Sequence, residues 1–306
     1  MRDIYILYNP NANNGGGKED AEALGVCYPE AVMIDMTRIT RYPVFFKGME
    51  EDDAVIICGG DGTLNRFVND TNGIEIRNEL YYFACGTGND FARDLGHNSY
   101  DDPRFPINRY VTNLPRVTVN GKSMLFLNNV GFGIDGYCCE VGDARREKNK
   151  VCAKPKPINY TAIAIKRLLL YFKPRNAVVT VDGKQTTYRK VWLAPTMNGR
   201  YYGSGMMPTP AQDRLRDDGK VSLMIFHGTG KLRTLMIFPS IFKGEHIRHR
   251  KNVTILEGHD IRVEFDRPTP LQIDGETIPD VSRYEVVTNI APKQQIKEKQ
   301  TADITE

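Results

Sequence analysis

The chain has 306 residues, with 41 lysine and arginine residues against 38 aspartate and glutamate residues, so its formal net charge is only +3. This balance excludes the broad basic surface of a general nucleic-acid-binding protein, and a hydrophobic content of 41% excludes wholesale disorder. No apolar run approaches the roughly 18 residues that a membrane-spanning helix needs, and the first residues show no signal-peptide pattern. We therefore expect a cytoplasmic protein whose six cysteines, none of them in a C-x-x-C pair, are reduced.

Short apolar runs alternate with polar, helix-compatible segments over residues 1–115. The runs predict strands at residues 4–8, 32–34, 54–58 and 80–85. Near-continuous apolar strands with intervening helices are typical of a parallel sheet that is covered on both faces. We therefore predict an α/β domain over residues 1–115.

From about Pro115 the pattern changes to short alternating strands, with runs such as 178–181, 221–225 and 261–265. Tight hairpin turns are indicated where asparagine or aspartate precedes glycine, at Asn120-Gly121, Asp182-Gly183, Asp218-Gly219 and Asp274-Gly275. We predict a β-rich sandwich domain over residues 116–290, interrupted by one helix near 158–172. The segment 285–300 is a candidate for packing back on the first domain, and residues 292–306 are predicted to form a frayed tail.

The strongest chemical signal is Gly59-Gly60-Asp61-Gly62-Thr63-Leu64-Asn65, directly after the predicted strand at 54–58. Glycines let the backbone approach a ligand closely, and N–H groups at the start of a following helix favour phosphate. The segment is neither a Walker A loop nor a G-x-G-x-x-G fingerprint. Asp61 would repel phosphate unless a divalent cation intervened, which indicates Mg²⁺. A strand-to-helix turn that uses glycines only for geometry is the alternative.

A second glycine-rich loop, Gly86-Thr87-Gly88-Asn89-Asp90-Phe91-Ala92, follows the predicted strand at 80–85. Loops at the carboxyl ends of strands line one crevice in an open α/β sheet, which is where ligands bind. Asn89 or Asp90 could equally serve as a helix cap. The polar turn from Asn9 to Lys18, after the first strand, fits either nucleotide contact or a flexible surface connection.

Together these segments resemble the diacylglycerol kinase catalytic-domain family, which includes bacterial soluble lipid kinases and the sphingosine and ceramide kinases. The resemblance rests on Asn9-Pro10 and the two glycine-rich loops, and it extends to the segments 203–210 and 215–221 and to Asp274-Gly275-Glu276. It implies ATP-dependent phosphorylation of a lipid hydroxyl, with diacylglycerol as the default substrate. It also implies an N-terminal domain like that of NAD kinase and phosphofructokinase and a C-terminal β-rich domain, with the site between them.

The resemblance further implies roles for individual residues. ATP would be contacted by Asn9, Thr37, Gly59, Gly60, Asp61, Gly62, Thr63, Asn65, Gly86, Thr87, Asn89 and Asp90. Asp218, with the backbone carbonyls of Leu215 and Lys220, would hold Mg²⁺. Glu276 would be the general base, and a rival assignment gives that role to Asp61. From the residues alone, the segments 217–219 and 274–276 are ordinary turns.

Basic residues gather in two places: Arg145, Arg146, Lys148, Lys150, Lys154 and Lys156, and then Lys243, Arg248, Arg250 and Lys251. A solvated surface is the alternative interpretation of such runs. A lipid kinase must reach its substrate, so we expect peripheral contact with the inner membrane face and no nucleic-acid partner. A homodimer is left open.

Two other functions stay open. An NAD-kinase-like enzyme for a soluble substrate would share the Gly-Gly-Asp-Gly loop, although the second half lacks the Gly-Ser/Thr-rich substrate loop expected of it. A catalytically silent nucleotide-binding regulator is permitted by the altered first loop, where Asn11-Ala12-Asn13-Asn14 stands before the first glycine.

Overall fold

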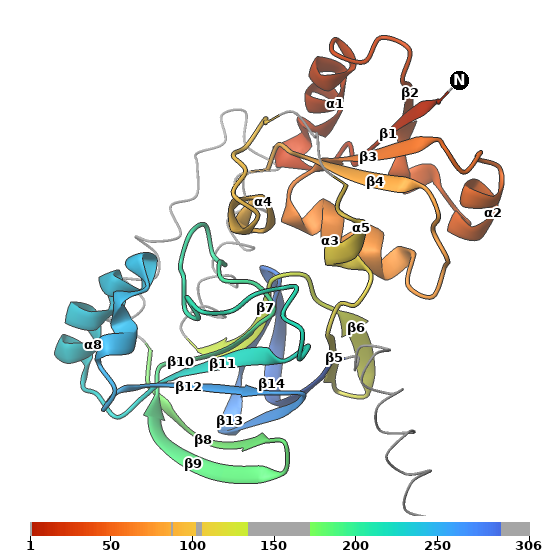
Figure 1. The fold of residues 1–306 in the computed structure, drawn as a ribbon. Helices are drawn as coiled ribbons and strands as arrows, with labels where there is room; N and C mark the ends of the chain where they lie inside the picture. The colour runs from red at the N-terminus through yellow and green to blue at the C-terminus, as the bar shows by residue number, and fades with distance from the viewer. Residues whose placement is uncertain (1, 87, 102–105, 134–171, 289–306) are drawn as a thin grey trace, which may run out of the picture. The chain divides into compact units, whose positions relative to one another are not determined.

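The computed structural model describes residues 2–86, 88–101, 106–133 and 172–288. The chain divides into two compact units, Met1–Thr112 and Asn113–Glu306 (Figure 1). The predicted helix at 158–172 lies outside the described residues except for its last residue, and the basic residues 145–156 and the tail 292–306 lie outside them as well. In the part of the chain that is described, no helix is long and apolar enough to cross a membrane.

The first unit is built on a parallel sheet of four strands in the order β2-β1-β3-β4. The strands are β1 (Ile4–Tyr8), β2 (Val32–Asp35), β3 (Ala54–Gly59) and β4 (Glu79–Ala84). β1 pairs in parallel with both β2 and β3, and β3 pairs in parallel with β4. Every residue of β3 is buried, as a continuous apolar run predicts for a central strand. The predicted α/β domain with a parallel sheet is confirmed.

Helices cover both faces of this sheet. The helical segments are η1 (Asn13–Gly15), α1 (Gly17–Gly25), η2 (Met36–Arg38), α2 (Tyr42–Lys47), α3 (Asp61–Asp70), α4 (Asp90–Asp94) and α5 (Asn108–Val111). α1 lies on one side, with α2 and α3 on the other (Figure 1). Alternate strand residues point to opposite faces, so Ile56 and Cys58 pack with Leu24 of α1. On the opposite face, Tyr42 of α2 contacts Phe67 of α3 edge to face.

Two of the cysteines predicted to be reduced core thiols meet inside this sheet. Cys58 and Cys85 are buried free thiols whose sulfur atoms lie 3.7 Å apart. Cys27 is an exposed free thiol. Cys138, Cys139 and Cys152 lie outside the described residues.

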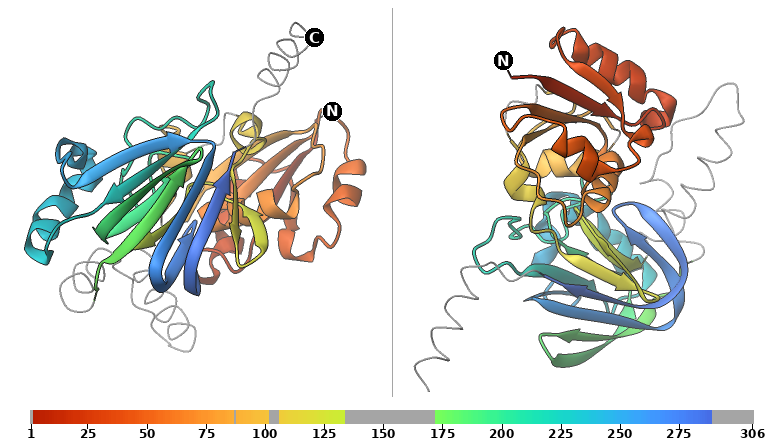
Figure 2. Two further views of the ribbon diagram at one scale, coloured as in Figure 1. Left: turned by 90° about the horizontal axis from the view of Figure 1, so that it is seen from below. Right: turned by 90° about the vertical axis from the view of Figure 1, so that its right-hand side faces the viewer.

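The second unit is an antiparallel β-sandwich (Figures 1 and 2). The strands on its main path pair in the order β12-β11-β10-β7-β13-β14-β5-β6, while β8 pairs with β13 and β9. They are β5 (Arg116–Val119), β6 (Lys122–Leu125), β7 (Asn129–Gly133), β8 (Arg175–Val181), β9 (Lys184–Val191), β10 (Leu193–Met197), β11 (Val221–Phe226), β12 (Val253–Gly258), β13 (Asp260–Ile273) and β14 (Glu276–Val287).

β13 links the two parts of the sandwich. Its first half, Ile261 to Phe265, pairs with β8, whereas Leu271 to Ile273 pair with β7. The register shifts between Glu264 and Leu271, where β-bulges bend the strand. Alternate residues of both halves therefore enter one core, which includes Val263, Leu271 and the buried ring of Tyr284.

Three of the four predicted hairpin turns are confirmed. Asn120-Gly121, Asp182-Gly183 and Asp274-Gly275 each have two positive φ angles and join antiparallel partners. Asp218-Gly219 instead belongs to the long connection before β11. Residues 285–288 are the described part of the segment 285–300, and residues 285–287 pair with β5 inside the second unit.

A short helical layer follows β11. It consists of α8 (Lys231–Ile237), η3 (Phe238–Lys243) and η4 (Glu245–Arg248). Its buried side chains, among them Ile237, Phe238 and Ile241, pack against Trp192 and Phe226 in a second hydrophobic cluster. This layer leaves the opposite side of α8 exposed to solvent.

Candidate functional site

The first predicted loop is mostly helix. β3 ends at Gly59 and α3 begins at Asp61, so Gly62, Thr63 and Asn65 lie in the first turns of a helix. Thr63 is buried, and its side chain fills the space that a Cβ atom on Gly59 would need. The N–H groups of Thr63 and Leu64 donate to the carbonyl of Gly60 at 2.9 and 3.2 Å. The first N–H groups of a helix generally lack intrahelical partners, which makes a helix start suited to binding phosphate.

The two glycine-rich loops touch through their backbones. A Cβ atom on Gly86 would lie 2.5 Å from the Cα of Gly60, and one on Gly60 would lie 3.1 Å from the Cα of Gly86. The N–H of Cys85 also donates to the carbonyl of Gly59 at 3.0 Å. Glycine is therefore required at both loop positions because a side chain on either residue would collide with the backbone of the other loop, and not because of a special φ angle.

Asn89 holds the second loop in shape. Its side-chain oxygen accepts from the N–H of Gly86 at 3.1 Å, and its amide nitrogen donates to the Gly86 carbonyl at 2.6 Å and to the Ser99 hydroxyl at 2.7 Å. The residue is buried and has a left-handed φ of 48° at the start of α4. Asn89 occupies the N-cap position of α4, which begins at Asp90, but its side chain makes no capping hydrogen bond to the helix. It positions the loop backbone instead.

Asp61 connects the same two loops. One oxygen of its carboxylate accepts from the N–H of Asp90 at 2.7 Å and the other from the N–H of Phe91 at 3.3 Å. Burial raises the pKa of Tyr82 well above its usual value, and the nearby Asp61 carboxylate raises it further. The carboxylate predicted to bind the nucleotide or act as a base therefore also fixes the start of α4.

The remaining predicted nucleotide residues lie at the same edge of the sheet. Asn9 follows β1, and its side-chain oxygen accepts from the N–H of Asn11 at 3.0 Å. Thr37 follows β2, and both its N–H and its hydroxyl donate to one oxygen of Asp35, at 2.9 and 2.6 Å. The hydroxyl of Thr37 is the main cause of a lowered Asp35 pKa. The structure brings the described members of the predicted set to the carboxyl ends of four parallel strands, whereas Thr87 lies outside the described residues.

In the second unit, Glu276 is the first residue of β14 and follows the turn Asp274-Gly275. Its side chain is exposed, and it has no ion pair or side-chain hydrogen bond to any of the described residues. A carboxylate in this state can accept a proton from an incoming hydroxyl group.

Asp274 fixes the turn that carries Glu276. Its carboxylate accepts the backbone N–H groups of Leu127, Asn128 and Asn129, the last two at 2.7 and 2.9 Å. Burial raises the pKa of Asp274, although these three N–H groups act in the opposite direction. The sequence indicated only a turn residue here, because the partners lie about 145 residues earlier in the chain.

Arg214 binds the same segment, residues 127–129, whose backbone N–H groups Asp274 accepts. Its guanidinium donates to the Leu127 carbonyl at 2.6 Å and to the Asn128 side-chain oxygen at 2.5 Å. The amide of Asn198 donates to the same Leu127 carbonyl at 3.0 Å. Sequence reasoning missed Arg214, which lies directly before the segment 215–221 that resembles the family.

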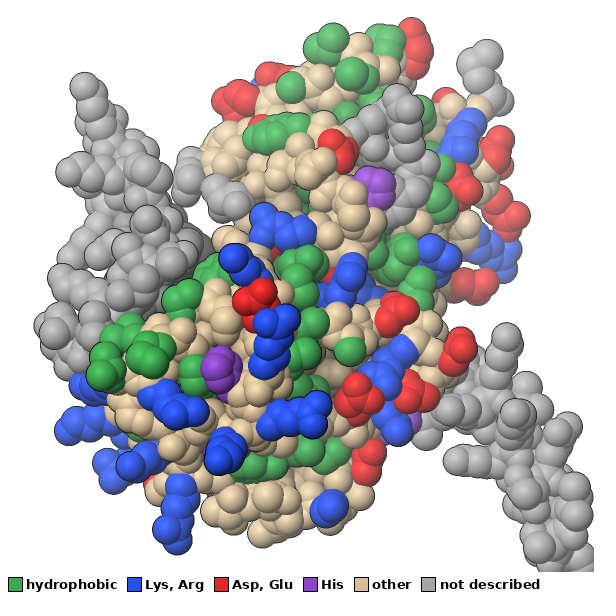
Figure 3. Space-filling model, turned by 60° about the vertical axis from the view of Figure 1, so that its left-hand side comes forward, with side chains coloured by type: hydrophobic (Ala, Val, Ile, Leu, Met, Phe, Trp, Pro, Cys, Tyr) green, Lys and Arg blue, Asp and Glu red, His purple; other side chains and the backbone are tan. Residues whose placement is uncertain are grey.

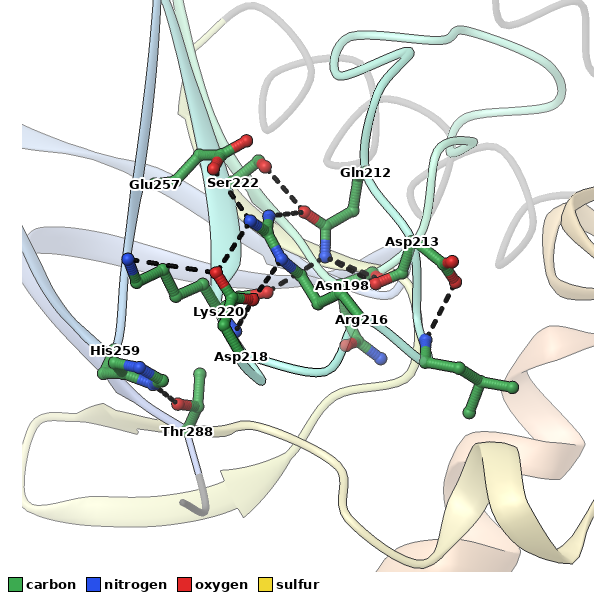
Figure 4. Close-up of polar contacts among 11 residues, drawn as sticks. Asn198, Gln212, Asp213, Arg216, Asp218, Lys220, Ser222, Glu257, His259 and Thr288 are labelled. Carbon is green, nitrogen blue, oxygen red and sulfur yellow. Dashed lines mark hydrogen bonds and ion pairs between the residues drawn. The ribbon is translucent and has the colours of Figure 1, made fainter. Parts of the chain in front are cut away.

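The predicted magnesium ligands do not form a free donor set (Figure 4). Arg216 donates to both carboxylate oxygens of Asp218, from Nε at 2.5 Å and from Nη2 at 3.1 Å. The carbonyl of Lys220 accepts from the side chain of Gln212 at 3.2 Å. Within the described part of the chain, no cluster of three or more His, Cys, Asp or Glu residues could hold a metal ion. Asp218, which Arg216 engages, and the Lys220 carbonyl, which Gln212 engages, therefore do not fit a bound Mg²⁺ as they stand.

Comparison with known proteins identifies the family. Residues 3–118 match the diacylglycerol kinase catalytic domain, and residues 129–294 match the YegS C-terminal NAD kinase beta sandwich-like domain. The chain belongs to the diacylglycerol kinase catalytic-domain family. Within this family it is 25% identical over 287 residues to a diacylglycerol kinase of Bacillus subtilis, covering 90% of each chain. It is 28% identical over 202 residues to a diacylglycerol kinase of Mycobacterium tuberculosis, covering 64% of this chain and 62% of that one.

A solved structure shares the fold. A crystal structure of a Bacillus anthracis protein superposes with a TM-score of 0.63 at 20% identity, covering 94% of this chain and 93% of that one. The predicted family and the predicted fold class, a parallel α/β domain followed by a β-sandwich, are both confirmed.

Proposed function

We propose that this protein is an ATP-dependent lipid kinase that phosphorylates diacylglycerol to phosphatidic acid. The proposal depends above all on the two glycine loops held in backbone contact at the carboxyl edge of the parallel sheet, in a chain of this kinase family. Such an edge is where open α/β sheets bind nucleotides. The names of the relatives in Bacillus subtilis and Mycobacterium tuberculosis support diacylglycerol as the acceptor.

Phosphoryl transfer requires positioning and charge stabilisation more than covalent chemistry from the protein. In the proposed reaction, the bond between the γ-phosphorus and the β,γ-bridging oxygen breaks, and a bond from the lipid hydroxyl oxygen to the γ-phosphorus forms. ADP leaves with the bridging oxygen, and the hydroxyl proton passes to a carboxylate. Mg²⁺ enters with ATP as part of the substrate and neutralises the phosphate oxygens.

The two candidate bases have different surroundings, and these favour Glu276. The Asp61 carboxylate accepts two backbone N–H groups at the start of α4, so protonating it would weaken the contact between the loops. Glu276 is exposed, and Asp274 holds its turn in place. We assign proton acceptance to Glu276 and loop positioning to Asp61.

The test is transfer of label from γ-labelled ATP to lipid, with diacylglycerol and a total lipid extract as separate acceptors and NAD as the soluble control. Wild type, Glu276→Gln and Asp61→Asn are compared, and thermal unfolding is measured for all three. We expect labelled phosphatidic acid from wild type. Loss of a general base costs about 10²–10⁴-fold in rate, so Glu276→Gln should lose this activity at unchanged stability, whereas Asp61→Asn should also unfold at a lower temperature.

Equal activity of wild type and Glu276→Gln would remove Glu276 as the base. Label in NAD and in no lipid would replace the proposal with an NAD-kinase-like activity. Nucleotide binding without label in any acceptor would leave a catalytically silent nucleotide-binding protein.

We further propose that α8 rests on an anionic membrane surface during catalysis. Leu232 and Met236 are one helical turn apart on α8 and are 75% and 71% exposed. Figure 3 shows a face of the molecule on which lysine and arginine side chains gather around exposed hydrophobic ones. The basic side chains next to α8 in the chain are all exposed, and they are Lys231, Arg233, Lys243, Arg248, Arg250 and Lys251. Burying each apolar side chain would contribute about 1.5–3 kcal/mol, and each basic residue about 1 kcal/mol.

Sedimentation with vesicles that contain an anionic phospholipid tests this surface. We expect salt-sensitive binding of wild type, and at least about a tenfold loss in a Leu232→Ser/Met236→Ser variant. Val26→Ser is the matched control, because Val26 is 80% exposed but lies in the first unit. Absence of wild-type binding at low salt, or equal losses in both variants, would contradict the proposal.

A further inference from the structure

Arg216 lies at the centre of a polar cluster in the connection between β10 and β11 (Figure 4). Besides its two bonds to Asp218, its Nη2 donates to Glu257 of β12 at 2.8 Å and its Nη1 donates to the side-chain oxygen of Gln212 at 3.3 Å. The side chain is only 20% exposed. The guanidinium therefore fastens the connection to an edge strand of the sandwich.

Gln212 makes this arrangement rigid. It is buried, and its oxygen also accepts from the Ser222 hydroxyl at 2.6 Å. Its nitrogen donates to the carbonyls of Asn198 and Lys220 at 3.3 and 3.2 Å. The amide that orients Arg216 thus also engages one of the two carbonyls that were expected to bind a metal.

Both carboxylate oxygens of Asp218 already face a cationic group. Mg²⁺ binds oxygen at about 2.0–2.1 Å, and the Nε atom of Arg216 already lies 2.5 Å from one oxygen of Asp218. The second oxygen has Nη2 of Arg216 at 3.1 Å and the ammonium of Lys220 at 3.9 Å. A metal ion on this carboxylate would compete with the guanidinium for the same oxygen atoms, and the two positive charges would repel each other.

The charges of the four ion-paired side chains also balance without a metal ion. Asp218 and Glu257 each contribute one negative charge, and Arg216 and Lys220 each contribute one positive charge. A divalent ion would add two uncompensated positive charges at short range, which is unfavourable at a half-buried site. Removing Arg216 would instead leave two carboxylates facing one ammonium group, a composition that attracts a cation.

We propose that the Arg216 guanidinium takes the place of a structural magnesium ion at this turn, so that the second unit folds and stays folded without a divalent cation. The turn is then fixed by a permanent, covalently attached cation. If the proposed function holds, the Mg²⁺ requirement of the reaction comes from the ATP complex alone. That last consequence rests on the proposed function, whereas the binding experiments below use no nucleotide and do not depend on it.

The first experiment compares Mn²⁺ binding to wild type and Asp218→Asn by electron paramagnetic resonance, without nucleotide. We expect the two proteins to bind Mn²⁺ equally weakly, because the Asp218 carboxylate is occupied by Arg216. Binding by wild type that is lost in Asp218→Asn would overturn the proposal. This comparison requires no variant of Arg216.

The second experiment measures thermal unfolding of wild type and Arg216→Met in EDTA and in millimolar Mg²⁺. We expect the wild-type Tm to be the same in both conditions, and the Arg216→Met Tm in EDTA to fall by about 2–4 °C, as for the loss of one charge-assisted contact. Mg²⁺ should restore part of that loss, and Asp218→Asn in the same variant should abolish the recovery. A wild-type Tm that rises with Mg²⁺, or an Arg216→Met variant that gains neither stability nor Mn²⁺ binding, would show that the guanidinium does not substitute for a metal.

Discussion

Gly86→Ala tests the contact between the two glycine loops directly. The added Cβ atom would lie 2.5 Å from the Cα of Gly60 and 2.9 Å from the side-chain oxygen of Asn89. The nearest atom belongs to the backbone, so no side-chain rotation can relieve the clash. Overpacking of this kind costs about 1–3 kcal/mol, and the reduced freedom of the unfolded chain returns about 0.4–1 kcal/mol.

The net loss is therefore about 1–2 kcal/mol, which corresponds to a Tm lower by roughly 2–8 °C for a chain of this size. Differential scanning fluorimetry of wild type and Gly86→Ala, each with and without ATP and Mg²⁺, measures both stability and nucleotide binding. We expect Gly86→Ala to lose stability and also much of the stabilisation by ATP, because its loop shifts away from Gly60.

Gly62→Ala is the matched control. A Cβ atom on Gly62 would meet nothing within 4 Å, and the residue lies in the first turn of α3. Alanine is favoured over glycine in a helix by about 0.5–1 kcal/mol, so this variant should be slightly more stable than wild type. If the phosphates approach the start of α3, Gly62→Ala should nevertheless lose ATP affinity. A Gly86→Ala protein as stable as wild type would refute the contact between the loops.

Three further predictions concern single side chains. Asn89→Ala should lower the free energy of unfolding by about 2 kcal/mol in a denaturant titration, because it removes three partly buried hydrogen bonds and places alanine at a left-handed φ. Burial raises the Asp218 pKa, but Arg216 outweighs it and holds the pKa below its usual value. The stabilisation by this carboxylate is thus present above about pH 4 and lost as the pH falls through the lower folded pKa, so the Tm difference between wild type and Asp218→Asn should shrink in acid. Burial lowers the His246 pKa, so the unfolded state binds a proton more readily than the folded state. The Tm should therefore begin to fall as the pH drops below about 6.5, and His246→Gln should reduce that pH dependence of the Tm.

The local sequence determined most of the architecture. The continuous apolar runs of β1, β3 and β4 predicted buried parallel strands, because only a sheet covered on both faces buries every residue of a strand. The glycine loops after β3 and β4 could be placed at the same edge, because parallel strands end on the same side. The turns at Asn120 and Asp182 were predictable because two residues fix the hairpin geometry.

The sequence drew attention to several carboxylates but did not reveal what they contact. Asp61 and Asp274 were singled out as a nucleotide or base residue and as part of a turn, yet each accepts N–H groups from a distant segment. Asp218 was assigned to a metal only through the resemblance to the family, because the residues alone indicated an ordinary turn. The fold instead supplies Arg216 and brings Glu257, 41 residues beyond Arg216, to the same guanidinium.

The physical reason is the range of the interactions. Strand burial, helix starts and hairpin turns depend on neighbours within a few residues, so a short stretch of sequence is enough to predict them. A carboxylate instead accepts hydrogen bonds from N–H groups that the folded chain brings near it. In the sequence these donors lie 29 residues from Asp61 and 146 residues from Asp274. The positions of these carboxylates in the chain could therefore be recognised from the sequence, whereas the tertiary structure decided which hydrogen-bond and ion-pair partners each carboxylate has.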